Sequence, residues 1–201
     1  MHDKIAIIGL GYVGLPTAIG FNDAGFNVWG VDVSQRTVDM VRAGENPTGD
    51  PDVDDIIPAP GTERWNITTS TAEAVPHCDV VLVTVPTPIT HDLKPDLSYV
   101  AAAGRAVFEA IPKDSNTIVV LESTVYPGVT AQTWLPIIEE LGLVIGDDVE
   151  IGGFITCGCD REEIVGVVDC NPECDFPFRQ KHSNEFFCVW YRNIVGIDWI
   201  S

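Results

Sequence analysis

The sequence predicts an α/β fold built on a doubly wound parallel sheet, followed by an irregular C-terminal tail. Short apolar runs alternate with helical segments through roughly the first 150 residues, which is typical of βαβ units. The first run ends in the glycine-rich turn GLGYVG at residues 9–14, where a helix is expected to begin. After Gly153 the alternation stops, so we divide the chain into a domain of residues 1–152 and a tail of residues 153–201.

The first half of the chain is expected to contain two strand–helix units. Parallel strands are buried on both faces and read as continuous apolar runs, whereas Ser at an N-cap and Gly after the last turn mark helix ends. Four elements follow in order: a strand at 4–8, a helix at 14–24 closed by Gly25, a strand at 27–31, and a helix from the cap Ser34 to residue 43 closed by Gly44. Residues 44–66 are rich in Gly, Pro and Asp and predict only a turn at 54–57.

The second half continues the alternation. A short strand at 66–69 leads to Ser70 and Glu73, whose spacing is that of a capping box and predicts a brief helix. The remaining elements are expected in this order: a strand at 79–85, a loop at 86–96, a helix at 97–111, a strand at 117–122, a helix at 129–141 kinked by Pro136, and a strand at 148–152.

Composition excludes several classes of partner. The chain carries 30 acidic and 11 basic residues, a formal net charge of -19. Nucleic acid and anionic membranes are bound through clustered Lys and Arg, so neither is expected as a partner. No apolar run reaches the ~20 residues of a membrane span, and the N-terminus lacks the features of a signal peptide, so we expect a cytoplasmic protein. The acidic surface fits a high-salt cytoplasm and equally an ordinary acidic protein.

The turn at residues 9–14 has the pattern G-x-G-x-x-G in the context that gives this pattern meaning. It follows the first strand, opens a helix and precedes Asp32 at the end of the second strand, as in a Rossmann-like dinucleotide site. Gly9 permits the tight turn, Gly11 lets a pyrophosphate approach the backbone, and Gly14 allows close helix–strand packing. Asp32 is placed to accept hydrogen bonds from a ribose, which favours NAD over NADP, although a 2′-phosphate could still bind the nearby Arg36.

Polar residues follow the later strands at the same edge of the predicted sheet. Ligands of doubly wound sheets bind beyond the carboxyl ends of the strands. Two segments follow such ends, Val85-Pro86-Thr87 and Glu122-Ser123-Thr124. We expect Thr87, Ser123 and Thr124 to line the crevice towards the nicotinamide half of the cofactor, although Thr87 could equally satisfy its own turn.

The cysteines are unevenly distributed. Cys78 precedes its strand, so it lies at the wrong end of the sheet for chemistry and is expected to be a core residue. The other cysteines and a histidine crowd the tail: Cys157, Cys159, Cys170, Cys174, His182 and Cys188. Their spacing fits none of the well-attested zinc patterns. We therefore expect no metal site, with zinc as the alternative, and a poorly ordered tail.

Four motifs together resemble a known family. They are GLGYVGLPTA at 9–18, VDVSQRTVD at 31–39, TVPTPI at 84–89 followed by KPDLSYV at 94–100, and ESTVYPGVT at 122–130. In this order they resemble the N-terminal domain of the UDP-glucose/GDP-mannose dehydrogenase family. These enzymes oxidise C6 of a nucleotide sugar to a uronic acid with NAD. The residues of the last two motifs are most similar to those of the branch that acts on UDP-N-acetylhexosamines.

The resemblance implies a set of site residues and partners. The pyrophosphate loop would comprise Gly9, Leu10, Gly11, Tyr12, Val13 and Gly14, with Asp32 as the ribose acid. Pro86 and Thr87 would lie against the cofactor, and Thr124 would lie by the nicotinamide and help to position a catalytic water. At the position five residues after the acid, where the family often has a lysine, this sequence has Thr37. The resemblance therefore implies that the neighbouring Arg36 replaces that lysine. NAD is the implied cofactor, and a UDP-sugar is the implied partner of the full-length family.

The resemblance covers residues 4 to about 152 and ends there. No residue of the tail matches the family's catalytic cysteine or its substrate and dimerising regions, so the expected chain is truncated and its oligomeric state is left open. The leading hypothesis is the NAD-binding domain of a nucleotide-sugar 6-dehydrogenase, and the alternative is a cofactor-binding remnant without turnover. Another NAD-dependent hydroxyacid dehydrogenase fits the last two motifs poorly.

Overall fold

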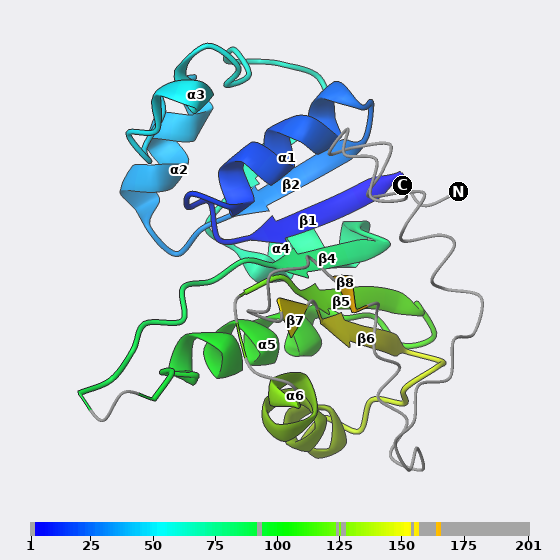
Figure 1. The fold of residues 1–201 in the computed structure, drawn as a ribbon. Helices are drawn as coiled ribbons and strands as arrows, with labels where there is room; N and C mark the ends of the chain where they lie inside the picture. The colour runs from blue at the N-terminus through cyan, green and yellow to red at the C-terminus, as the bar shows by residue number, and fades with distance from the viewer. Residues whose placement is uncertain are drawn as a thin grey trace, which may run out of the picture.

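A single parallel sheet organises the fold. The computed structural model describes residues 3–91, 94–123, 125, 128–153, 155–156 and 164–165. Six parallel strands lie in the order β3-β2-β1-β4-β5-β6 (Figure 1). They are β1 (Lys4–Ile8), β2 (Asn27–Val31), β3 (Trp65–Thr68), β4 (Val80–Val83), β5 (Thr117–Leu121) and β6 (Val149–Gly153). The chain changes direction across the sheet between β1 and β4, which confirms the predicted doubly wound α/β fold.

Helices cover both faces of the sheet. In chain order they are α1 (Gly14–Asp23), α2 (Gln35–Arg42), α3 (Pro51–Asp54), α4 (Thr71–Ala74), the 3-10 turn η1 (Val75–His77), α5 (Ser98–Ala110) and α6 (Val129–Glu140). Figure 1 shows α1 and α2 on one side of the sheet and α5 and α6 on the other. A short antiparallel pair, β7 (Ile155–Thr156) with β8 (Ile164–Val165), follows β6. The remainder of the predicted tail lies outside the described residues.

One hydrophobic cluster lies on each face of the sheet, and successive residues along a strand alternate between the two clusters. Under α1, the cluster draws alternate strand residues such as Ile7, Leu82 and Val120. Under α5 and α6, it draws their neighbours, such as Val83 and Leu121. This alternation is the period of two of a β-strand. It fixes which residues point to the same face where each strand ends.

Most predicted elements are confirmed within a residue or two, and two predictions need correction. Residues 44–66 contain the short helix α3, where only a turn was predicted, although Asp50 caps the helix and Pro51 opens it. The fourth strand is shorter than the predicted 79–85 and ends at Val83. Pro86 has no N–H to donate to a ladder, and the carbonyl of Val85 accepts from the Ser123 hydroxyl at 2.6 Å instead.

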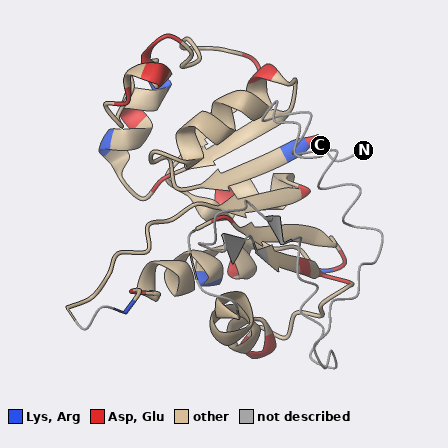
Figure 2. Cartoon of the chain, in the orientation of Figure 1, with Lys and Arg blue, Asp and Glu red and all other residues tan. Residues whose placement is uncertain are grey.

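Basic residues are few and separated along the described part of the chain, whereas acidic residues are scattered over the helices and loops (Figure 2). Within the described part of the chain, no helix is long and apolar enough to cross a membrane.

Asp148, just before β6, joins three segments at the amino end of the sheet. The buried carboxylate accepts hydrogen bonds from the backbone N–H of Asp114 at 2.7 Å, the N–H of Val144 at 2.8 Å and the Lys113 ammonium at 3.0 Å. These bonds, with the Asp114 N–H first, lower the pKa of Asp148. The charged form is therefore the one that the fold stabilises.

We expect Asp148→Asn to lower the Tm by several degrees at pH 7, because the amide can no longer accept all three bonds. A depressed folded pKa gives stability that is present above the ordinary Asp pKa of about 4 and is lost as pH falls through the folded value. The difference in Tm between wild type and variant should therefore shrink in melts below about pH 4. Glu140→Gln, which breaks an exposed pair with Arg105, is the control and should change the Tm little. A constant difference at all pH values would contradict this account.

Candidate cofactor-binding site

The glycine loop between β1 and α1 is shaped by contacts with β4. Gly9 has φ +102°, a conformation that favours glycine. A Cβ at Gly14 would lie 1.8 Å from the Gly9 carbonyl oxygen and 2.4 Å from Thr84 Oγ1. A Cβ at Gly11 would meet no atom within 4 Å. Packing thus requires glycine at two positions, while the third leaves open space in front of the backbone.

Thr84, directly after β4, holds this loop in place, a role that was not predicted from the sequence. Its hydroxyl lies 2.8 Å from the carbonyl oxygen of Gly9 and 3.1 Å from that of Ile8, and can donate to either. Its only sequence signal is a hydroxyl at the end of an apolar run. The contact fixes the turn from which α1 begins.

Asp32, directly after β2, is bound to the glycine loop. Its Oδ2 accepts the N–H of Leu10 at 2.9 Å, and its Oδ1 accepts the N–H of Ser34 at 2.8 Å. A carboxylate has about four lone-pair sites, so each oxygen keeps capacity for one more donor. The predicted ribose acid is therefore oriented by the backbone, with acceptor sites to spare.

The rim of the loop is apolar and exposed. Tyr12 is 72% exposed, Val13 53% and Val33 99%, which is unusual for apolar side chains unless a ligand or partner covers them. Val33 follows Asp32 and was missed, although an apolar residue beside the ribose acid is a readable signal. Leu10 differs from its neighbours because its side chain is buried in the core, so only its backbone is available to the site. Arg36 lies exposed in the first turn of α2.

The second half of the predicted site follows β4 and β5. The Ser123 hydroxyl donates to the carbonyl of Val85 at 2.6 Å, so it ties the two strand ends together and is itself 6% exposed. Pro86 is exposed and Thr87 is half-buried on the same loop. Thr124, predicted to lie by the nicotinamide, falls outside the described residues.

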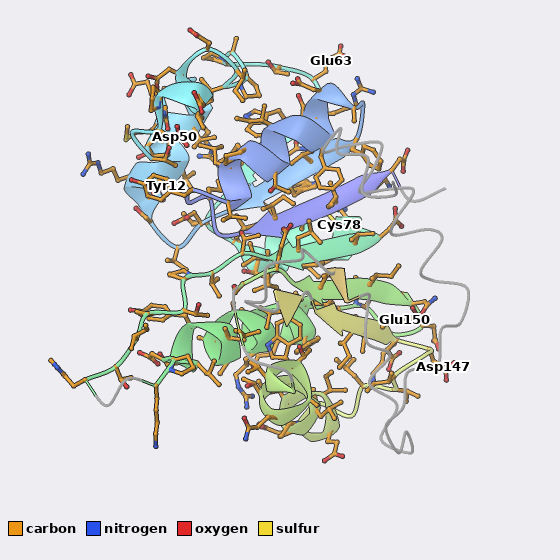
Figure 3. All side chains as sticks on the ribbon, viewed as in Figure 1. Tyr12, Asp50, Glu63, Cys78, Asp147 and Glu150 are labelled. Atoms are coloured by element: carbon orange, nitrogen blue, oxygen red, sulfur yellow. The ribbon has the colours of Figure 1, made fainter. Side chains whose placement is uncertain are left out.

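Two further ionisable residues differ sharply in position. Glu122 directly follows β5 at the carboxyl edge, and burial raises the pKa of its carboxyl to about 7. Cys78 precedes β4 at the opposite edge, and Figure 3 places it well away from Tyr12. Burial, with a smaller contribution from Asp79, raises the pKa of the Cys78 thiol to about 12, and the sulfur lies 3.4 Å from the carbonyl of Ala74. Cys78 is therefore a core residue and not a nucleophile. The tail cysteines considered for zinc lie outside the described residues.

The residues present fit a dinucleotide. The open space at Gly11 would admit a pyrophosphate to the backbone at the N-terminus of α1, which carries the positive end of the helix dipole. In the first turn of α1, the Leu15 and Thr17 N–H groups already donate to the carbonyls of Gly11 and Val13 and Pro16 has no N–H, so a phosphate would bind the N–H groups of the preceding loop. Asp32 stands one strand away with acceptor sites for ribose hydroxyls. These features meet where the strand order reverses, the usual ligand position of doubly wound sheets.

Known proteins share this sequence pattern and fold. Protein CapL of Staphylococcus aureus is 37% identical over 154 residues, 76% of this chain and 34% of the relative. The UDP-N-acetyl-D-glucosamine 6-dehydrogenase of Pseudomonas aeruginosa is 35% identical over 150 residues, 74% of this chain and 34% of the relative. The chain thus spans about a third of the length of these curated relatives.

Solved structures agree. The GDP-mannose dehydrogenase of Pseudomonas aeruginosa superposes with a TM-score of 0.77 at 28% identity, covering 95% of this chain and 44% of that one. A UDP-D-ManNAc dehydrogenase from Pyrococcus horikoshii gives 0.67 at 30% identity, covering 78% and 37%. Residues 3–152 match the family described as UDP-glucose/GDP-mannose dehydrogenase family, NAD binding domain. The chain therefore belongs to the UDP-glucose/GDP-mannose dehydrogenase family, and its sheet is the family's NAD-binding domain.

Proposed function

We propose that this chain is the cofactor-binding part of a nucleotide-sugar 6-dehydrogenase, which oxidises C6 of a UDP-N-acetylhexosamine to a uronic acid. The observation that carries the cofactor role is the pairing of open space at Gly11 with the spare acceptor sites of Asp32 on adjoining strand ends. The substrate class is supported by relatives named for UDP-N-acetylglucosamine and UDP-N-acetylmannosamine.

The chain's own residues bind and orient the cofactor in this proposal. NAD⁺, when bound, supplies the hydride acceptor. The N-terminus of α1 binds the pyrophosphate, Asp32 accepts from ribose hydroxyls, and the exposed side chain of Val33 packs against the adenine. Arg36 takes the place of the family's lysine, and Thr124 lies by the nicotinamide. The full proposed site comprises Gly9, Leu10, Gly11, Tyr12, Val13, Gly14, Asp32, Arg36, Val85, Pro86, Thr87, Ser123 and Thr124.

We expect the chain to bind NAD(H) more tightly than NADP(H), because a 2′-phosphate would place negative charge beside the Asp32 carboxylate. Like charges at close range cost several kcal/mol. Asp32→Asn keeps one oxygen for the Leu10 N–H and removes the charge, so it should narrow the preference by about tenfold or more. Calorimetric titration of both cofactors measures this. Asp39→Asn, an exposed acid on α2, is the control, and equal affinities in the wild type would refute the role of Asp32.

Substrate turnover is a separate measurement. Reduction of NAD⁺ is followed with UDP-N-acetylglucosamine, UDP-N-acetylgalactosamine, UDP-N-acetylmannosamine and UDP-glucose in turn. Reduction with UDP-glucose alone would contradict the proposed substrate class. A second candidate for residues 1–201 is cofactor binding without turnover, because Cys78, the free cysteine of the described part of the chain, is buried at the edge of the sheet opposite the cofactor site. NAD binding with no reduction of NAD⁺ by any of the sugars would support that candidate.

A further inference from the structure

Glu122 is a half-buried acid that the site described above does not use. Its Oε2 is inaccessible to solvent and has no hydrogen-bond partner among the described residues. Leaving a buried carboxyl oxygen unpaired costs folding free energy. Such an atom at the ligand-binding edge of a sheet points to a partner that arrives with the ligand.

The strand registers place Glu122 in one row with the cofactor residues. The pairs Ile8 with Val31, Ile8 with Val83, and Val83 with Leu121 lie side by side. The ladder continues one residue further, because the N–H groups of Gly9, Thr84 and Glu122 donate to Val31, Ile8 and Val83 at 2.7, 2.9 and 2.9 Å. The next residue of each strand therefore completes a row across the carboxyl edge: Asp32, Gly9, Thr84 and Glu122.

By the period of two of a strand, the side chains of Asp32, Thr84 and Glu122 fall on the α1 side of the sheet. Each of the three stands two positions after a residue that points to that face: Gly30, Leu82 and Val120. Glu122 is the neighbour of Thr84, the residue that holds the glycine loop. Three strand spacings, roughly 14 Å, separate it from Asp32 at the other end of the row. The row thus begins with a carboxylate at the adenosine side and ends with a second carboxyl group at the opposite side.

The described surroundings offer no charge to neutralise Glu122. On this face, α1 carries only Asp23 in its last turn, β4 carries no charged residue, and β6 carries Glu150, level with Ile118 and four residues before Glu122. Figure 3 shows Glu150 on the side of the molecule away from Tyr12. Burial alone accounts for the raised pKa of about 7. The missing partner should therefore be a cation or an N–H donor, and the nicotinamide of NAD⁺ is both.

We propose that Glu122 binds the nicotinamide group of NAD⁺, its buried carboxylate oxygen accepting from the carboxamide N–H beside the positively charged ring. The inference rests on the NAD-binding function of this domain. It also makes Glu122 a specificity-determining residue, because the ring of NADH is neutral and loses the attraction between charges. The oxidised cofactor is favoured over the reduced one by this residue.

The test is calorimetric titration at pH 8 of wild type and Glu122→Gln with NAD⁺, NADH and ADP-ribose. Hydrogen bonds to charged groups contribute about 1.5–3 kcal/mol, so NAD⁺ should bind about tenfold or more weakly to the variant. The affinity for NADH should fall by a smaller factor. The affinity for ADP-ribose, which lacks the nicotinamide, should be the same in the variant and the wild type. Unchanged NAD⁺ affinity, or an equal loss for all three ligands, would overturn the proposal. Failure of the wild type to bind even ADP-ribose would instead overturn the cofactor function, and the inference with it.

Proton release gives an independent readout. NAD⁺ binding favours the ionised carboxylate, so at pH 7 the wild type should release a fraction of a proton on binding NAD⁺, measured from enthalpies in buffers of different ionisation heat. Glu122→Gln should release none, whereas Glu150→Gln, an exposed acid on the same face, should behave as wild type. Equal release by wild type and Glu122→Gln would refute the assignment.

The thermal stability of Glu122→Gln shows whether the variant folds, and the direction of the expected change in Tm follows from the raised pKa. The folded pKa of Glu122 is raised, so the folded state binds more protons than the unfolded one between about pH 4.5 and 7, and stability falls as pH rises through that window. Glu122→Gln removes this loss. Its Tm at pH 8 should therefore equal or exceed that of the wild type, and a lower Tm would contradict the burial of an ionised, unpaired carboxylate.

Discussion

Gly14→Ala is expected to destabilise the fold and abolish NAD binding together. The added Cβ would lie 1.8 Å from the Gly9 carbonyl oxygen and 2.4 Å from Thr84 Oγ1. The first is a backbone atom, and the second belongs to a short β-branched side chain that the carbonyls of Gly9 and Ile8 hold by hydrogen bonds. The helix α1 must then move off the sheet, at a cost of at least about 1–3 kcal/mol. Thermal melts and NAD⁺ titration measure the two losses.

Gly11→Ala is the matched control, one turn away in the same motif. A Cβ there meets nothing within 4 Å, and Gly11 is absent from the residues with positive φ, so the Tm should stay within a degree or two of the wild type. The methyl group would occupy the space through which a pyrophosphate approaches the backbone, so NAD⁺ affinity should fall by at least about tenfold. If both variants bind NAD⁺ like the wild type, the loop is not the cofactor site.

The contrast between the two glycines shows how far sequence reasoning reached. The motif and its place between a strand and a helix predicted the loop, because few other uses require three glycines at that spacing. The motif also predicted that Gly14 serves packing and Gly11 serves the ligand, and the space around each glycine agrees with this. What the motif could not tell is which residue Gly14 packs against, because that residue, Thr84, is 70 residues away in sequence and contacts it only because β4 pairs with β1.

The same limit explains Glu122. From the sequence, Ser123 and Thr124 were assigned to the cofactor crevice, whereas Glu122 was given no role. Sheet register places it in the row of Asp32, and burial leaves its oxygen without a partner. Ser123, by contrast, faces the other way and bonds to Val85. Alternation along a strand decides which residue faces which side, and it is readable only when the end of the strand is known, which the predicted range of 79–85 overestimated for β4.

Trp134→Ala is expected to be the most damaging core substitution, at about 3–5 kcal/mol. Trp134 is fully buried in α6. Its indole N–H donates to the carbonyl of Val100 on α5 at 3.0 Å, and its ring meets Phe108 edge-on at 5.4 Å. Chemical denaturation measures the loss. Tyr99→Ala, which removes a 50% exposed aromatic ring from α5, is the control and should cost within about 0.5 kcal/mol.

Gly104→Ala tests the same contact, because its effect on stability should change from destabilising to stabilising when Trp134 is removed. A Cβ at Gly104 would lie 2.2 Å from the indole nitrogen of Trp134, so Gly104→Ala alone should destabilise the protein although Ala favours helices by about 1 kcal/mol over Gly. In the Trp134→Ala background the obstruction is gone, and Gly104→Ala should then stabilise by helix propensity and by filling part of the space. A double-mutant cycle measures this coupling. The same sign in both backgrounds would show that α5 and α6 do not pack through this pair. Because α5 follows the loop after β4 and α6 follows the end of β5, this contact also anchors the two segments that the cofactor proposal needs in register.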